Sequence, residues 1–268
     1  MKCPVCQKEI DNDSLFCEYC GAKLKKENKN GKKINILIVS FLLIICVIIL
    51  IGYRISYFSE QESIEMGNGY DVIIEDTRAI DLGLSVKWAS CNVGATRPEQ
   101  YGDYFAWGEV EPKTTYNWST YKYCVDNYDN LTKYCNNRNY GNNGFTDNKT
   151  VLDLEDDAAH VNWGGSWRMP TEAEQDELRN NCRWDWTTQN GVNGYKVTGP
   201  NGNSIFLPAA GYMLEGNLNG GGSWGHYWSS SLDTGGPDYA YGVGFDSDGV
   251  GWGYYSRDSG RSVRPVCK

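Results

Sequence analysis

The segment from Ile34 to Tyr53 constrains the chain most, because its 20 residues carry no charge. A helix of this length, rising ~1.5 Å per residue, spans the roughly 30 Å hydrocarbon core of a bilayer. A cleaved signal peptide is the alternative, but the apolar run begins only after 33 residues and no small-x-small cleavage site follows it directly. Residues 34–53 are therefore predicted to form a transmembrane helix.

The charges on the two sides of this segment differ. Six lysines lie between Lys23 and Lys33, whereas Arg54 and then the acidic residues from Glu60 to Glu65 follow the apolar run. Cytoplasmic flanks carry the excess of Lys and Arg in membrane proteins. We therefore expect a single-pass protein of the cytoplasmic membrane, with a cytosolic N-terminus, a basic juxtamembrane segment over residues 25–33 and a C-terminal part outside the cytoplasm.

Four cysteines in the first 24 residues form two Cys-x-x-Cys pairs, Cys3 with Cys6 and Cys17 with Cys20. Four thiolates at this spacing suit tetrahedral zinc, and a reducing cytosol does not sustain structural disulfides. Residues 1–24 are therefore predicted to be a zinc ribbon that binds one structural zinc ion, with a redox dithiol pair or an iron site as the alternatives. Four protein ligands leave no open position for catalysis, so its role is structural or a contact with a cytosolic protein.

The charge of the chain is divided unevenly. Residues 1–33 carry a formal charge of +3, and residues 54–268 carry −12. Nucleic acid is excluded as a ligand of the acidic part, because binding phosphates needs a basic surface. We interpret residues 54–79 as an acidic linker and residues 80–268 as one folded body.

Within the body, short signals predict both helices and strands. The stretch "TVLDLEDDAAHV" places Val151, Leu154, Ala158 and Val161 at helical spacing behind a Thr150 cap. The stretch "TEAEQDELRNNC" predicts a second helix, which begins with a capping box of Thr171 and Glu174. Alternating apolar residues around "GPNGN" and "DSDG" predict two hairpins, over residues 195–207 and 241–254. The body is therefore expected to be α+β.

These residues also carry a family resemblance. The blocks "IDLGLSVKWASCNVGATRPEQYGDYFAWGE", "LDLEDDAAHVNWGGSWRMPTEAEQDEL", "NGYKVTGPNGNSIFLPAAGY", "YWSSS" and "GRSVRPVCK" resemble the Fibrobacter succinogenes major paralogous domain over residues 80–268. That family is similar to formylglycine-generating enzymes and C-type lectins. The resemblance implies a C-type lectin-like fold in which the first and last strands pair. One departure is Gln175, which stands where Trp is usual.

The likeness to an oxygenase fold raises the question of catalysis. Some relatives use an iron triad of two His and a Glu, but His160 and His226 are far apart in this sequence. Cys182 and Cys267 do not stand in the copper motif of the formylglycine-generating enzymes. The acidic stretches "DLEDDAA" and "DSDG" do not follow the spacing of a calcium loop. We therefore predict a protein without catalytic activity and keep a metal-dependent oxygenase as the lesser alternative.

The body contains five cysteines, and outside the cytoplasm they are expected to form disulfides. Cys124 and Cys135 flank a short Asn- and Tyr-rich segment and are one candidate pair. Cys91 and Cys267 are the other, because the resemblance implies that the first and last strands pair. This assignment leaves Cys182 over.

Aromatic residues are frequent in the segment that extends from just before the second predicted hairpin toward the terminal strand. In C-type lectin-like folds this region supplies the ligand face, and Tyr and Trp give rigid contact area. The alternative is that about half of them are core residues, on the inward alternation of their strands. The candidate ligand-binding residues are Trp224, Tyr227, Trp228, Tyr239, Trp252, Tyr254 and Tyr255.

Together these features predict a membrane-anchored binding module of the cell envelope. Its C-terminal body would bind a protein or glycan outside the cytoplasm, while the zinc ribbon remains in the cytosol. A structural or assembly protein of the envelope is the main alternative.

Overall fold

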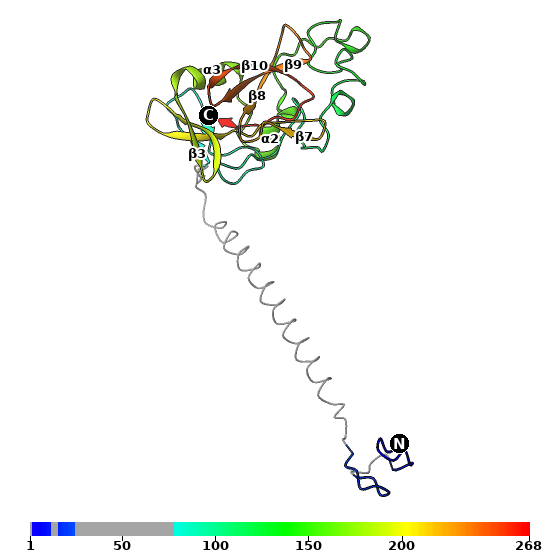
Figure 1. Ribbon diagram of the computed structural model, residues 1–268. Helices are drawn as coiled ribbons and strands as arrows, with labels where there is room; N and C mark the ends of the chain where they lie inside the picture. Colours follow the sequence, from blue (N-terminus) through cyan, green and yellow to red (C-terminus); the bar gives the residue numbers. More distant parts are fainter. Residues whose placement is uncertain (1, 12–15, 25–77) are drawn as a thin grey trace, which may run out of the picture. The chain divides into compact units, whose positions relative to one another are not determined.

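The computed structural model describes residues 2–11, 16–24 and 78–268 (Figure 1). These residues belong to two units, an N-terminal one and a C-terminal body. None of the helices in the described ranges is both long enough and apolar enough to cross a membrane. The predicted transmembrane helix over 34–53, the basic segment over 25–33 and the linker up to residue 77 lie outside the described residues.

The N-terminal unit consists of two similar turns. The amide of Cys3 donates to the Lys8 carbonyl, and the amide of Cys17 donates to the Ala22 carbonyl, each at 2.9 Å. Gly21 has a φ of +73°, which is the left-handed conformation that glycine adopts without strain. Only four hydrophobic side chains are buried in the described part of this unit: Cys3, Ile10, Cys17 and Leu24. A core of this size cannot stabilise a fold by itself.

The body is mostly β with few helices, so strands contribute more than the predicted α+β class implied. Its helices are η1 (Trp118–Thr120), η2 (Asn142–Gly144), η3 (Leu154–Asp156), α2 (Ala158–Trp163) and α3 (Glu172–Asn181). Its strands are β1 (Ala79–Ile80), β2 (Lys87–Ala89), β3 (Arg183–Gln189), β4 (Val192–Thr198), β5 (Ser204–Pro208), β6 (Tyr212–Leu214), β7 (Asn217–Asn219), β8 (Gly225–Leu232), β9 (Tyr239–Asp246), β10 (Gly249–Ser256) and β11 (Val266–Cys267).

The strands form antiparallel sheets in the orders β1-β2-β11, β10-β9-β8, β3-β4-β5 and β6-β7. Both predicted hairpins are confirmed, as β4–β5 and β9–β10. The pairing between the first and last parts of the body is also present, because Val266 lies opposite Trp88 and Cys267 lies opposite Lys87. The C-terminus consequently lies within the body (Figure 1).

Helix α3 begins as the sequence predicts. The Thr171 hydroxyl accepts from the Glu174 amide at 3.3 Å, and the Glu174 carboxylate accepts from the Thr171 amide at 2.8 Å. Gln175, one residue further on, donates from Nε2 to the Tyr227 and Trp228 carbonyls at 3.2 and 3.0 Å. The helix is therefore fixed directly to strand β8.

The predicted helix behind Thr150 is wrong in its start and its continuity, since only the short helix η3 and, from Ala158, helix α2 are helical. Val151 forms a β-bridge with Ser231, and the Leu152 amide donates to the Ser230 carbonyl at 3.0 Å. Helix α2 begins later, behind Asp157, whose carboxylate accepts from the His160 and Met169 amides. Pairing with the end of β8 thus replaces the helix that the local spacing favours.

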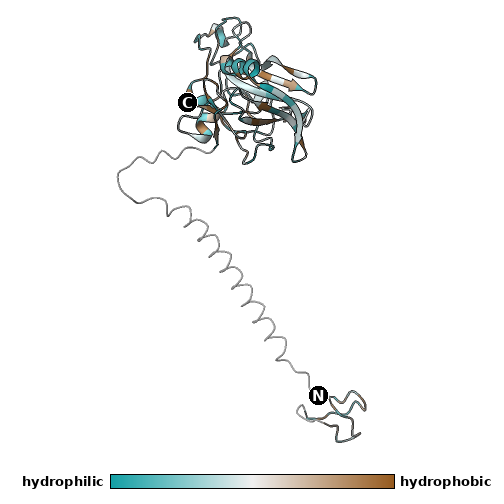
Figure 2. Cartoon of the chain, turned by 90° about the vertical axis from the view of Figure 1, so that its left-hand side faces the viewer, coloured by the Kyte–Doolittle hydropathy of each residue, from teal (hydrophilic) through white to brown (hydrophobic). Residues whose placement is uncertain are grey.

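Strand β8 separates the two hydrophobic cores of the body. Successive side chains of a strand point to opposite faces, and here Trp228 joins one core while Tyr227 joins the other. Helix α3 and β4–β5 close the Tyr227 core, whereas the residues around Trp107 and Tyr134 build the Trp228 core. Hydrophobic segments accordingly recur along the strands of the body (Figure 2).

Neither predicted disulfide is formed, since Cys91, Cys124 and Cys135 are free thiols. The Cys124 and Cys135 thiols donate instead to different carbonyls, those of Trp118 and Asn137, each at 3.1 Å. The strand register explains the other pair. Cys267 lies opposite Lys87, whereas the chain next to Cys91 runs beside Val263, to which the Val93 amide donates. Cys91 and Cys267 therefore lie at different positions along the two paired segments and are not opposite each other.

The segment from Arg257 to Cys267 is buried along its whole length. Arg257 donates to the Tyr121 hydroxyl and to the carbonyls of Lys133, Tyr134 and Pro237 at 2.7–3.0 Å. Arg264 donates to Asn92 Oδ1 and to the carbonyls of Ala89 and Phe206 at 2.8–3.0 Å. These two guanidinium groups thus join the terminal segment to loops and strands from the rest of the body.

We expect Arg264→Met to lower the free energy of unfolding by roughly 3–5 kcal/mol, because it leaves buried acceptors without donors. Urea unfolding of the full chain, followed by tryptophan fluorescence, measures this loss in the body alone, since all ten tryptophans lie between residues 88 and 252. Arg183→Met is the matched control, because that side chain is 71% exposed. A loss below ~1 kcal/mol for Arg264→Met would contradict the structural role.

Candidate functional site

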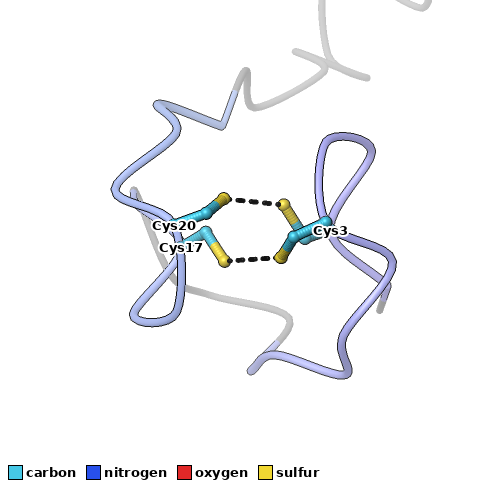
Figure 3. A group of neighbouring side chains, drawn as sticks. Cys3, Cys17 and Cys20 are labelled. Carbon is cyan, nitrogen blue, oxygen red and sulfur yellow. Dashed lines mark hydrogen bonds between the residues drawn. The ribbon is translucent and has the colours of Figure 1, made fainter.

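The four N-terminal cysteines converge on one point. Cys3 Sγ lies 3.7 Å from Cys20 Sγ, Cys6 Sγ lies 3.6 Å from Cys17 Sγ, and all four sulfurs lie within 4.8 Å of one another. Figure 3 shows the side chains of Cys3, Cys17 and Cys20 directed inward. A tetrahedral site with Zn–S bonds of ~2.3 Å has sulfur–sulfur edges of about 3.8 Å. The cluster therefore fits one structural zinc.

The turn around Cys3 also favours the thiolate form that zinc needs. The backbone N–H of Cys6, followed by that of Val5, lowers the pKa of Cys3 to about 6. The Val5 amide donates to Cys3 Sγ at 3.4 Å. When zinc is bound, four thiolates complete its coordination, so the ion supplies folding free energy and no open position for substrate.

A second cluster of metal-ligating residues, Asp153, Glu155 and Asp156, contains an ammonium group. Lys133 Nζ lies 2.9, 3.2 and 2.5 Å from their carboxylates, and the Tyr134 hydroxyl donates to Asp156 at 2.7 Å. Burial raises the pKa of Asp156, but hydrogen bonds from Lys133, Tyr123 and Tyr134 outweigh it and lower the pKa to about 2. Lys133, together with Lys122 on Asp156 and Lys149 on Asp153, balances the three carboxylates, so the cluster is an ion-pair network.

A pocket of about 630 Å³ lies over one face of the β8–β9–β10 sheet. Glycines make up most of this face: Gly244 lies between His226 and Gly251, and Gly242 lies between Trp228 and Gly253. Residues directly opposite in a sheet share a face. We call this cavity the glycine pocket; it is lined by Tyr212, Trp224, His226, Gly244, Phe245, Asp246, Gly249, Gly251, Trp252, Tyr255 and Arg261.

The ring of Tyr255 decides which part of the glycine face is open. A Cβ atom at Gly244 or Gly253 would collide with Tyr255, so that ring covers the sheet there. A Cβ atom at Gly249 or Gly251 would meet no atom within 4 Å. The hollow of the glycine pocket therefore lies above Gly249 and Gly251.

Aromatic rings surround this hollow. The His226 ring lies 5.1 Å from Tyr255, 5.4 Å from Tyr212 and 6.4 Å from Trp224, all in edge-on arrangements. Trp224 is 45% exposed and offers its ring to a ligand. Burial, followed by the nearby Arg261 charge, lowers the pKa of His226 to about 3, so its imidazole is neutral at physiological pH.

The structure divides the seven predicted aromatic residues into three groups. Trp224, Trp252 and Tyr255 line the glycine pocket. Tyr227 and Trp228 are buried, so their prediction as ligand residues is wrong. Strand β8 packs on both faces, and a strand buried on both sides does not show the alternation of apolar and polar residues that would mark its inward side. Tyr239 and Tyr254 are partly exposed but do not line the pocket; they lie on the other face of the hairpin, since Tyr254 is opposite Tyr241 and Tyr239 is opposite Ser256.

Sequence reasoning missed Tyr212, His226, Arg261 and the glycines as parts of one site. A signal for the glycines is nevertheless present, because every second residue of "GVGWG" and of "YGVGF" is glycine. Alternating glycines in a strand mark a face where another group approaches closely. No local pattern shows that Arg261, which follows the hairpin, turns back to this face.

Comparison with known families agrees with the geometry of the cysteine cluster. The family model for zinc-ribbon domains matches residues 2–24, and the model for a domain of unknown function, DUF8237, matches residues 171–266. The chain carries a zinc-ribbon domain and a DUF8237 domain. No curated protein and no solved structure matches the chain. The DUF8237 match extends from α3 to β11 and includes every residue of the glycine pocket.

For the zinc ribbon, we expect the full chain to bind one zinc per molecule and Cys17→Ser to abolish this binding, because the change removes one of four ligands. Metal analysis after gel filtration measures the stoichiometry. The tryptophan-reported unfolding of the body should stay unchanged. Cys182→Ser, outside the cluster, is the control and should retain one zinc; retention of zinc by Cys17→Ser would contradict the assignment.

For the acidic network, we expect acid to weaken the body through Asp156. Its folded-state pKa lies below its ordinary value of 3.8, so its stabilisation is present above about pH 4 and is lost as the pH falls toward 2. Urea unfolding should show the wild type losing roughly 2 kcal/mol more than Asp156→Asn between pH 4 and pH 2. Glu155→Gln, whose side chain is 78% exposed, should keep the wild-type pH dependence; equal losses in wild type and Asp156→Asn would contradict the role.

Proposed function

We propose that this protein is a membrane-anchored binding module of the cell envelope, whose body binds a glycan or protein ligand in the glycine pocket. One observation carries this proposal: a hollow of about 630 Å³ bordered by the exposed ring of Trp224 and by Tyr212, His226 and Tyr255. Ligand sites are concave, largely apolar and aromatic, and contain a few fixed polar groups. Asp246 and Arg261 are such groups here.

The proposed fold of the body is C-type lectin-like, as in the Fibrobacter succinogenes major paralogous domain that its sequence resembles. The pairing of β2 with β11 supports this proposal, because the resemblance implies joined first and last strands. In folds of this type the segment before the terminal strand supplies the ligand face. Trp224, Tyr255 and Arg261 belong to that segment.

The proposed location follows from the sequence of residues 25–54. An apolar segment over 34–53 would anchor the chain in the cytoplasmic membrane, with the lysines before it in the cytosol. The body would then lie outside the cytoplasm, where a cell-envelope glycan or protein is available. Cysteines would be exposed to oxidation there, and the free thiols of Cys91, Cys124 and Cys135 are held within the body at low exposure or by carbonyl contacts.

For the zinc ribbon we propose a structural role and a contact with a cytosolic protein. Val5, Phe16 and Tyr19 are 70%, 55% and 55% exposed, so this small unit presents apolar side chains to its surroundings. Exposed apolar groups of this kind are typical of protein contacts. Such a contact would tether the cytosolic protein to the body across the membrane. A tether of this kind requires no conformational signal through the transmembrane segment.

The proposed binding is tested with Gly251→Val, because a Cβ atom at this position meets no protein atom within 4 Å and the added methyl groups extend from it into the hollow. We expect the full chain, immobilised, to retain a saturable component from a panel of soluble envelope glycans and proteins, and Gly251→Val to lose at least ten-fold in affinity. Tyr254→Ala is the matched control, since it removes an exposed aromatic ring on the same strand but outside the pocket.

Three outcomes are distinguished by this panel. Loss in Gly251→Val with retention in Tyr254→Ala supports the glycine pocket as the binding site. Equal retention by both variants places the ligand elsewhere and contradicts the proposal. Stoichiometric copper or iron in the same purified sample would favour the oxygenase alternative instead, and co-purification of a fixed set of envelope subunits in all three proteins would favour the assembly alternative.

A further inference from the structure

The three arginines of the buried terminal segment differ in how their charges are satisfied. Arg257 and Arg264 each donate three or more hydrogen bonds to protein oxygens. Arg261 is also buried, with 6% of its surface exposed, but its Nε and Nη1 atoms have no hydrogen-bond partner. Arg261 is also the member of this group that lines the glycine pocket.

Aromatic rings surround the Arg261 guanidinium, and the Asp258 carboxylate, which acts on it electrostatically, forms no ion pair with it. The Arg261 Cζ atom lies 3.8 Å from the Tyr255 ring centre, 4.9 Å from that of Tyr212 and 5.3 Å from that of Trp228. Within the described residues Arg261 forms no ion pair. Cation–π contacts recover only part of what a buried charge loses when it leaves water. Within the described residues, the pocket thus holds a positive charge that has no ion-pair partner.

The other polar groups of the glycine pocket limit what a counter-ion of Arg261 can be. His226 presents a buried Nδ1 atom that also lacks a partner. Asp246, at the β9–β10 turn, accepts from the amides of Asp248 and Gly249 through Oδ1 at 2.9 and 3.2 Å. An oxygen of this carboxylate can accept further hydrogen bonds. One cation and one hydrogen-bond acceptor therefore border a single hollow.

We propose that the glycine pocket recognises the carboxylate of an acidic sugar residue, with Arg261 as the counter-charge. The sugar ring would lie over Gly249 and Gly251, against Trp224, and its hydroxyl groups would donate to Asp246. This inference rests on the proposed function, because it names the ligand class of the same site. A polyanion fits less well, since residues 54–268 carry a formal charge of −12 and Asp246 borders the pocket.

The test compares sugars that differ only at the charged group. The probes are methyl β-D-glucuronide and methyl β-D-galacturonide, and their neutral counterparts are methyl β-D-glucoside and methyl β-D-galactoside. Binding to the full chain is measured by saturation-transfer NMR titration. We expect at least one acidic sugar to bind ten-fold or more tightly than its neutral counterpart, because a charge-assisted hydrogen bond adds roughly 1.4 kcal/mol or more.

Variants connect this preference to Arg261. Arg261→Met should bind the acidic and neutral sugars equally, whereas Arg261→Lys should keep part of the preference because it retains the charge. Gly251→Val should weaken both sugars together. Arg183→Met, which removes an exposed arginine outside the pocket, should behave as wild type. Thermal unfolding followed by tryptophan fluorescence verifies that each variant is folded, and the comparison of sugars on the wild-type chain needs no variant.

Equal binding of the acidic and neutral sugars by wild type would overturn the carboxylate inference but leave the glycine pocket as a binding site. An acidic preference that persists in Arg261→Met would overturn the role of Arg261. Absence of binding by all four sugars at 20 mM would overturn the acidic-sugar assignment, while the panel tested with Gly251→Val decides the proposed function independently.

Discussion

The buried segment that ends the chain is the constraint on which the rest of the body depends. Its backbone pairs with Trp88 near the start of the body, and its guanidinium groups donate to carbonyls of a loop (Tyr134) and of strand β2 (Ala89) more than a hundred residues away. A buried carbonyl without a donor costs free energy, so these segments are stable only when Arg257 and Arg264 are in place. The terminal residues thus complete the core from inside, which few C-terminal segments do.

The glycine pocket follows from the same arrangement. Strand β8 is buried between two cores, so its neighbours β9 and β10 have only one face left for a cavity. Glycines on that face leave room, and Tyr255 fills part of it and leaves the remainder open. Arg261 reaches this space because the terminal segment runs along β8, where Ser262 forms a β-bridge with Tyr227. Cavity and charge are therefore both products of how the chain ends.

Local signals predicted what depends on neighbouring residues, and failed where distant contacts decide. The zinc ribbon, the capping box at Thr171 and both hairpins need only short-range spacing, and all are present. The helix expected behind Thr150 does not begin there, because Val151 pairs with Ser231, which is 80 residues away in the sequence. Tyr227 looked like a surface residue because two-sided burial of β8 has no local signature. Likewise, the missing partners of Arg261 are visible only once every neighbouring oxygen has been placed.

The contrast among the three buried arginines argues that the unpaired one is functional. A fold that supplies seven hydrogen bonds to Arg257 and Arg264 can evidently satisfy buried guanidinium groups. An apolar residue at position 261 would pack among Tyr212, Trp228 and Tyr255 without the cost of desolvating a charge. Violations of local consistency in otherwise well-satisfied structures concentrate at functional sites. On the proposed function, the stability that Arg261 costs the free protein would be recovered when an anion enters the pocket, so the same residue that weakens the empty fold would supply binding free energy and selectivity for a carboxylate.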